Sequence, residues 1–173
     1  MRRNRKHAPI LTCAKKTEGQ LPQVKWFQVE LSMNIYFSCS ITGGRQDQKI
    51  YKQIVQFLLA EGHQVPTAHL SDPQIMVEES HITPAEVYAR DEAWVRNCDV
   101  LVAEVSTPSH GVGYEIALAE KYHKPIFCCY KAGTKVSKMI TGNPNTYLSI
   151  FPYTTANELL QALHAFLQNH TAD

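Results

Sequence analysis

The residues best suited to chemistry lie in one stretch, residues 99–130, which reads DVLVAEVSTPSHGVGYEIALAEKYHKPIFCCY. Residues 100–105 are a short β-branched apolar run, which predicts a strand buried on both faces. A turn-rich loop follows, and a helix is predicted to begin near Tyr114 and to end at Pro125. Residues 126–130 predict the next strand, so the stretch is expected to form a β-α-β unit.

The loop and helix start of this unit favour an anionic ligand. Ligands of open parallel sheets bind beyond the carboxyl ends of the strands, which is where four residues are expected: Ser109, Gly111, Gly113 and Glu115. Glycines let backbone amides approach a ligand and a helix N-terminus attracts anions, so a phosphate fits here. Glu115 in a first helical turn would stay ionised and could act as a nucleophile or base. The alternative is that Glu115 only complements the helix dipole and the glycines only make a turn.

A second carboxyl group, that of Asp91, falls on the core-facing side of another predicted helix. Residues 83–86 (TPAE) are typical of a capped helix start, and this helix is expected to run to about Asn97. Its buried stripe contains Val87 and Trp94, and Asp91 lies on that stripe. An unpaired carboxylate that faces a core is costly, so Asp91 must have a partner or face a cavity.

Two interpretations of Asp91 stay open from the pattern. It could form a structural ion pair with a base such as Arg90 or Arg45. Alternatively, it faces an apolar ligand cavity, where a carboxyl group stays protonated and can act as a general acid. Glu104, a carboxylate inside the predicted strand at residues 100–105, is expected to have a structural, hydrogen-bonded role.

The first predicted strand, residues 34–39 (NIYFSC), is followed by a glycine-rich loop, SITGGR. The amphipathic helix after this loop is expected to end at Gly62. A short second strand is predicted at residues 64–67 and leads to His69. Such a loop is by itself a weak signal for a phosphate or nucleotide, but its position directly after the first strand strengthens that signal.

The rest of the chain completes an alternation of strands and helices. Residues 136–140 predict a short helix, residues 147–151 a fifth strand, and residues 155–167 a final helix with a capping box and a leucine-rich face. The expected fold class is therefore α/β. It is a doubly wound, five-stranded parallel sheet in a three-layer, flavodoxin-like (Rossmann-like) sandwich, with strand order 2-1-3-4-5.

Length and charge indicate one domain with a distinct N-terminal segment. The 173 residues suit a single domain with its own core. Residues 1–32 carry seven Lys or Arg against two Glu, and they lack the apolar centre of a signal peptide. We expect residues 1–32 to be a disordered basic extension that is dispensable or even precedes the true start, and residues 33–173 to form the functional domain.

The remaining composition argues against several function classes. The rest of the chain has ten Lys or Arg and fourteen Asp or Glu, which argues against a broad nucleic-acid surface. No apolar run approaches the roughly 18 residues needed to cross a membrane. The five cysteines are odd in number and lack CxxC spacing, which favours buried free thiols in a reducing compartment, the cytoplasm or the nucleus. The eight histidines show no ligand spacing with the cysteines, so no metal site is expected.

Three motifs together resemble those of a known family: YFSCSITGGR, RDEAWVRNCDVLVAEV and PSHGVGYEIALA. They are similar to motifs of the 2′-deoxynucleoside 5′-phosphate N-hydrolases, within the nucleoside 2-deoxyribosyltransferase superfamily. The resemblance covers the chain from Asn34 to the last helix and leaves out residues 1–32. It implies an enzyme that cleaves the N-glycosidic bond of deoxynucleoside 5′-monophosphates, giving free base and 2-deoxyribose 5-phosphate.

The resemblance also implies roles for residues of this chain. Glu115 matches the nucleophile of the family, Asp91 its acid, and Tyr36 the tyrosine that contacts the nucleophile. Ser109 and Gly111 match residues that bind the phosphate. The other substrate-binding residues implied are Ser40, Ile41, Gly43, Gly44, Arg45, His69 and Ser137. Ser137 would come from a partner subunit, which implies a homodimer with a shared active site, and Cys39 stands where the family has glycine.

Elementary chemistry agrees with these roles. Departure of the base leaves an oxocarbenium-like sugar, which one carboxylate can trap while a protonated carboxyl group protonates the base. Retaining glycosidases work this way, with their two carboxyl groups roughly 5–5.5 Å apart. No cofactor is needed for this chemistry. Two alternatives stay open: a nucleoside deoxyribosyltransferase, which passes the same intermediate to another base, and a non-catalytic nucleotide-binding module.

Overall fold

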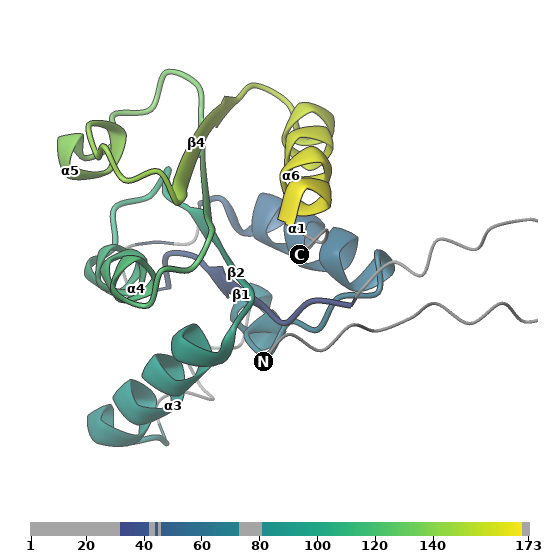
Figure 1. The fold of residues 1–173 in the computed structure, drawn as a ribbon. Helices are drawn as coiled ribbons and strands as arrows, with labels where there is room; N and C mark the ends of the chain where they lie inside the picture. The colour runs from purple at the N-terminus through teal and green to yellow at the C-terminus, as the bar shows by residue number, and fades with distance from the viewer. Residues whose placement is uncertain (1–31, 42–43, 45, 73–80, 171–173) are drawn as a thin grey trace, which may run out of the picture.

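A parallel sheet between two layers of helices forms the body of the protein (Figure 1). The computed structural model describes residues 32–41, 44, 46–72 and 81–170. Four strands lie in the order β1-β2-β3-β4: β1 (Ile35–Ser38), β2 (Val100–Glu104), β3 (Ile126–Lys131) and β4 (Leu148–Tyr153). The helical elements are α1 (Gln48–Ala60), η1 (Ala68–Ser71), α3 (Pro84–Asn97), α4 (His110–Lys121), α5 (Lys138–Thr141) and α6 (Ala156–His170). The predicted α/β class and parallel sheet are confirmed.

The predicted second strand at residues 64–67 is wrong, because only one residue of it pairs with the sheet. Gln64 forms an isolated parallel bridge with Asn34, on the edge of β1 where that strand was expected. Pro66 follows at once and has no N–H to continue a ladder. The next β1 donor, the Phe37 N–H, is satisfied by the Thr67 side chain, whose Oγ1 lies 2.9 Å from the nitrogen.

Each face of the sheet carries its own apolar layer, as expected for strands buried on both sides. Figure 1 shows α1 and α6 on one face, and α3 and α4 on the other. Ile35 and Phe37 of β1 belong to the cluster beneath α1 and α6, whereas Tyr36 belongs to the cluster beneath α3 and α4. Because side chains alternate along a strand, Ser38 lies on the same side of β1 as Tyr36.

The buried cysteines and Glu104 match their predicted structural roles. Cys39, Cys98, Cys128 and Cys129 are buried, and burial raises the pKa of the Cys98 thiol to about 11. Cys13 lies outside the described residues.

Glu104 is fully buried and hydrogen-bonded at the end of β2. It accepts from the Ser106 hydroxyl, from the Ser106 N–H at 3.3 Å and from the Tyr153 hydroxyl at 3.0 Å. Burial raises the pKa of Glu104 in spite of these donors.

The loops at the carboxyl ends of β1 and β2 are joined directly. The Thr107 hydroxyl donates to the Asp47 carboxylate at 3.0 Å, which ties the loop after β2 to the start of α1. Gly44, in the loop after β1, has a φ of +125°, a backbone conformation that favours glycine. Among the helices that the structure describes, none is long and apolar enough to span a membrane.

Candidate active site

Glu115 projects from α4, whose start differs from the prediction. The helix begins at His110 and not near Tyr114, because the Ser109 hydroxyl accepts the Val112 N–H at 3.5 Å and caps it. Gly111 is therefore helical, and Glu115 lies beyond the first turn. The predicted stabilisation of the Glu115 carboxylate by the helix dipole is correspondingly weakened, because that effect falls off within the first turn.

Two hydroxyl groups from β1 hold the Glu115 carboxylate in place of the dipole. The Tyr36 hydroxyl donates to Glu115 Oε1 at 2.8 Å, and the Ser38 hydroxyl donates to Glu115 Oε2. Tyr36 and Ser38 are buried, whereas Glu115 is half-buried. Burial, followed by the nearby charges of Glu115 and Asp91, raises the pKa of Tyr36. Tyr36 therefore remains a protonated donor across the neutral pH range.

Asp91 projects from α3, and the structure combines the two interpretations of it. The predicted capping box is present: the Thr83 side chain accepts from the Glu86 N–H, and the Glu86 carboxylate accepts from the Thr83 N–H. Two turns further on, the Arg90 Nε lies 2.7 Å from Asp91 Oδ1, which makes the ion pair. The Asp91 carboxyl group nevertheless lines a cleft, as the catalytic interpretation requires.

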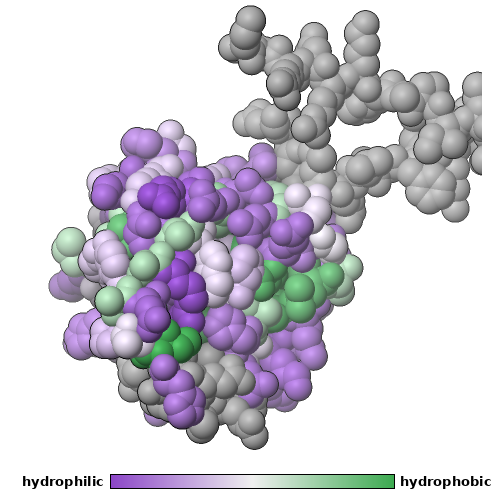
Figure 2. All heavy atoms as spheres, turned by 90° about the horizontal axis from the view of Figure 1, so that it is seen from below, coloured by the Kyte–Doolittle hydropathy of each residue, from purple (hydrophilic) through white to green (hydrophobic). Residues whose placement is uncertain are grey.

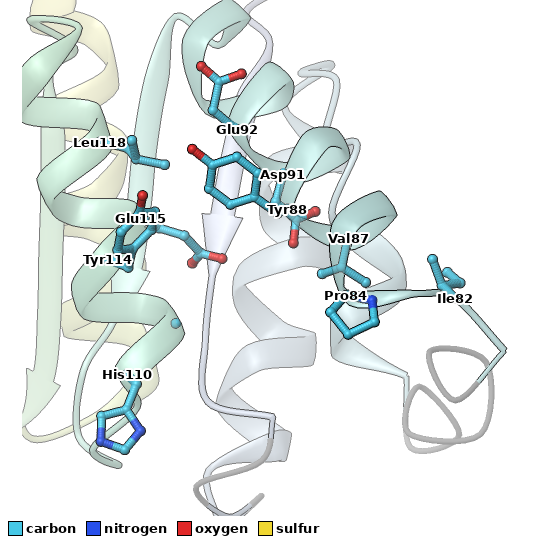
Figure 3. Close-up of a pocket in the computed structure, with 11 residues that line it drawn as sticks. Ile82, Pro84, Val87, Tyr88, Asp91, Glu92, His110, Tyr114, Glu115 and Leu118 are labelled. Carbon is cyan, nitrogen blue, oxygen red and sulfur yellow. The ribbon is translucent and has the colours of Figure 1, made fainter.

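The cleft between α3 and α4 has a volume of about 540 Å³ and contains both carboxyl groups. Figure 3 shows Asp91 and Glu115 projecting from facing helices into the space between them. The rest of the lining is largely apolar or aromatic: Ile82, Pro84, Val87, Tyr88, Tyr114 and Leu118, together with Glu92, His110 and Gly111. The rings of Tyr88 and Tyr114 lie 6.3 Å apart across the cleft.

Three more of the predicted site residues, Ser109, Gly111 and His69, lie at the start of α4 or next to α3. Ser109 caps α4, and Gly111 lines the cleft. His69 packs edge-on against Trp94, with ring centres 5.9 Å apart, and the Arg90 guanidinium lies over the same Trp94 ring, 5.0 Å from its centre. His69 is thereby joined to the helix that carries Asp91.

The first loop is only partly described. Ser40 is buried, and its hydroxyl has no hydrogen-bond partner within the described part of the chain. Ile41 packs against the core, and Gly44 lies close to Thr107. Gly43 and Arg45 lie outside the described residues.

Ser137 stands apart from the cleft of its own chain. It is exposed and caps α5 by accepting from the Met139 N–H at 3.3 Å. Ser137 is not among the residues that line this cleft.

Sequence reasoning missed Ser38, Tyr88 and His110. The period of two along β1 could have identified Ser38, because it shares a face with Tyr36. The described residues contain no group of three or more His, Cys, Asp or Glu that could hold a metal ion.

Two acidic side chains that face one cleft, on the flank of a parallel α/β sheet, are typical of enzymes that cleave glycosidic bonds. Comparison with known proteins agrees with this class. The family model described as nucleoside 2-deoxyribosyltransferase matches residues 35–151.

Curated relatives carry related names. A Methanosarcina mazei protein named putative 2′-deoxynucleoside 5′-phosphate N-hydrolase 1 is 37% identical over 135 residues, which is 78% of this chain and 84% of that protein. A Mus musculus protein named 5-hydroxymethyl-dUMP N-hydrolase is 42% identical over 113 residues, which is 63% of this chain and 65% of that protein. The chain therefore belongs to the nucleoside 2-deoxyribosyltransferase family.

A solved structure shares the fold. The Clostridium botulinum CMP N-glycosidase BcmB aligns with a TM-score of 0.56 at 20% sequence identity, over 75% of this chain and 98% of that one.

Proposed function

We propose that this protein hydrolyses the N-glycosidic bond of 2′-deoxynucleoside 5′-monophosphates, releasing the free base and 2-deoxyribose 5-phosphate. The protein is an enzyme of the N-glycosidase type, in keeping with relatives named as N-hydrolases. The observation that carries the proposal is the Glu115 carboxylate, held by two hydroxyl groups and facing a cleft that Asp91 also lines. This arrangement provides one carboxyl group for the sugar and one for the base.

The first half of the reaction forms a bond to the protein. One Glu115 carboxylate oxygen attacks C1′ of the deoxyribose while the bond from C1′ to the base nitrogen breaks. The bonding electron pair leaves with the base, which takes a proton from the Asp91 carboxyl group. A 2′-deoxy sugar lacks an electron-withdrawing hydroxyl, so its cation-like transition state forms more easily.

The second half regenerates the enzyme. A water molecule attacks C1′, the bond from C1′ to the Glu115 oxygen breaks, and the carboxylate leaves with its electron pair. The proton of the water passes to Asp91, which is then ready for another base. Arg90 pairs with Asp91 and orients its carboxyl group at the cleft.

The 5′-phosphate is best accommodated at the N-terminus of α4. Backbone N–H groups of a first helical turn have no partner inside the helix, and they attract anions together with the helix dipole. His110 and Gly111 of this turn line the same cleft as Glu115. A phosphate here would place the sugar between the helix start and the Glu115 carboxylate.

Base release from deoxynucleoside monophosphates tests the proposal. The full chain is incubated with deoxynucleoside monophosphates that include 5-hydroxymethyl-dUMP, and free base is followed by chromatography. We expect Glu115→Gln to lower the rate by roughly 10³-fold or more, because the nucleophile is lost. Glu120→Gln, on the same helix and outside the cleft lining, is the control and should leave the rate unchanged. Absence of base release from every monophosphate would contradict the proposed function.

A nucleoside deoxyribosyltransferase is the second candidate, and the matching family model favours it. Such an enzyme would form the same bond between Glu115 and C1′ and pass the sugar to a second base. Adding a free base in excess distinguishes the two activities. Appearance of the new deoxynucleoside at the expense of the free sugar product indicates transfer, whereas unchanged sugar release indicates hydrolysis.

We also infer a homodimer in which the Ser137 of one chain completes the cleft of the other. Figure 2 shows a largely hydrophilic surface that is interrupted by hydrophobic patches. Tyr88 and Tyr114 at the cleft are 54% and 53% exposed, and Met139, two residues after Ser137, is 83% exposed. Such side chains are suited to an interface, because burial of apolar surface stabilises association.

A further inference from the structure

We propose that Ser38 is a positioning residue that speeds the release of the sugar from Glu115. The inference rests on the proposed function and deepens it, because it concerns the second half of the reaction. The role assigned to Ser38 is exerted through the Glu115 carboxylate, to which its hydroxyl group donates.

Ser38 and Tyr36 donate to different oxygens of the Glu115 carboxylate. Ser38 lies two residues after Tyr36 on the same face of β1, so both hydroxyl groups reach one carboxylate. Tyr36 takes Oε1 and Ser38 takes Oε2. The last torsion angle of a glutamate side chain is soft, so a single donor would leave the carboxylate able to rotate. Two donors on different oxygens fix its plane.

The surroundings of Ser38 give its hydroxyl group no role in packing. Across the sheet Ser38 is paired with Ala103, and Ala103 is paired with Cys128, a row of small side chains. Ser38 is 0% exposed. Burying a hydroxyl group in an apolar layer is unfavourable unless it is hydrogen-bonded, and Glu115 supplies the acceptor. An alanine would serve the fold at this position, so the hydroxyl group points to a role at Glu115.

Charge on the carboxylate changes in opposite directions in the two half-reactions. When Glu115 attacks C1′, the new ester removes its negative charge, and a hydroxyl donor to that charge gives no help. When water attacks C1′, the C1′–O bond breaks and the negative charge returns to the Glu115 oxygens. A donor that is already aimed at the departing carboxylate then stabilises the transition state. Ser38 should therefore favour the second half of the reaction over the first.

Rapid-mixing kinetics of Ser38→Ala test this assignment. The rate of base release reports the first half, and the steady-state rate of 2-deoxyribose 5-phosphate release reports the second. We expect kcat to fall about tenfold, the loss typical of one hydrogen bond to a charged group, while kcat/KM stays within about threefold of wild type. Base should appear in a burst of about one equivalent per site, and intact-protein mass spectrometry should detect the glycosyl-enzyme.

Matched variants separate this effect from a change in packing. Cys128→Ala truncates a buried side chain in the same cross-sheet row and leaves the Ser38 hydroxyl group in place, so it should show neither the burst nor the drop in kcat. Ser38→Thr retains a hydroxyl group and should restore kcat. Melting temperatures of all three variants show whether each is folded.

The outcomes distinguish a failure of the Ser38 assignment from a failure of the proposed function. Loss of kcat and kcat/KM in equal measure, or behaviour like that of Cys128→Ala, would overturn the assignment of Ser38 while leaving the proposed function intact. A wild-type chain that releases no base would overturn both.

Discussion

Hydroxyl groups donate to the carboxylates of two glutamates, Glu115 of α4 and Glu104 at the end of β2. Glu115 accepts from Tyr36 and Ser38, and Glu104 accepts from Ser106 and Tyr153. The two groups differ in surroundings, since Glu115 lines the cleft and Glu104 is fully buried. Similar hydrogen bonding therefore occurs both at the cleft and inside the body of the fold.

The raised pKa of Glu104 predicts a pH-dependent stability. Because burial raises this pKa above its ordinary value of 4.5, the folded state binds the proton more tightly than the unfolded state. The stabilisation from this group is complete below the unfolded pKa and is lost as the pH rises through the folded pKa. Relative to Glu104→Gln, the free energy of unfolding of wild type should fall as the pH rises above the ordinary glutamate pKa of 4.5.

Urea denaturation at a series of pH values measures this difference. Glu120→Gln, which removes a carboxylate outside the buried cluster, serves as the control. A difference between wild type and Glu104→Gln that does not change with pH would contradict the prediction.

At the scale of elements, α3 begins with a capping box and has few fully buried residues. Val95 is the one fully buried residue of this helix, all of which the structure describes, so tertiary packing gives α3 limited support. The Thr83 capping box satisfies N–H groups at its start, while Asp91 lies two turns further along. Local interactions therefore contribute to the start of the helix that carries the proposed acid.

Removal of this cap should lower stability. We expect Thr83→Ala to reduce the free energy of unfolding by about 1 kcal/mol, the typical value for loss of an N-cap side chain. Thr154→Ala is a suitable comparison, because Thr154 contributes its backbone N–H and not its side chain to a contact with Glu158. Chemical denaturation of both variants measures the difference, and equal stabilities would show that the Thr83 cap contributes little.

Sequence patterns predicted most elements because their determinants are local. The β-branched run of β2, the capping box of α3 and the apolar face of α6 correspond to observed elements. The predicted strand at residues 64–67 was wrong for two reasons. Pro66 has no N–H to continue the ladder, and the Thr67 side chain accepts from the β1 donor that a strand would have used. The start of α4 was misplaced because glycines suggested a turn, although Ser109 caps a helix that includes them.

The candidate site was harder to predict than the fold. Glu115, Asp91 and Tyr36 could be selected from the motifs, and the structure brings them around one cleft or into direct contact. Whether Asp91 pairs with Arg90 or faces a cavity could not be decided from spacing, because the two options are not exclusive. Ser38 was missed because a serine within a strand carries no motif, and its meaning comes only from the position of Glu115.

At the scale of the whole molecule, the proposed shared site predicts both a mass and a complementation. Light scattering should give twice the chain mass of 19.6 kDa. Glu115→Gln and Ser137→Ala should each be impaired alone, because each site lacks one contributor.

Mixed dimers of these two variants should regain activity. In a mixed dimer, one site combines an intact Glu115 with the partner's Ser137, so random reassociation of equal amounts should restore about a quarter of the sites. A monomeric mass, or a mixture no more active than its components, would contradict the shared site.

The outer edge of β1 has a consequence for the behaviour of the protein in concentrated solution. Its Ile35 N–H donates to the Gln64 carbonyl at 2.8 Å, and its Phe37 N–H is occupied by the Thr67 side chain. An edge whose outward donors are already taken cannot template an added strand from a neighbouring molecule, the step that begins fibrous aggregation. The short, proline-interrupted segment at residues 64–67 thus protects the β1 edge more effectively than a regular fifth strand, which would itself have presented a new open edge.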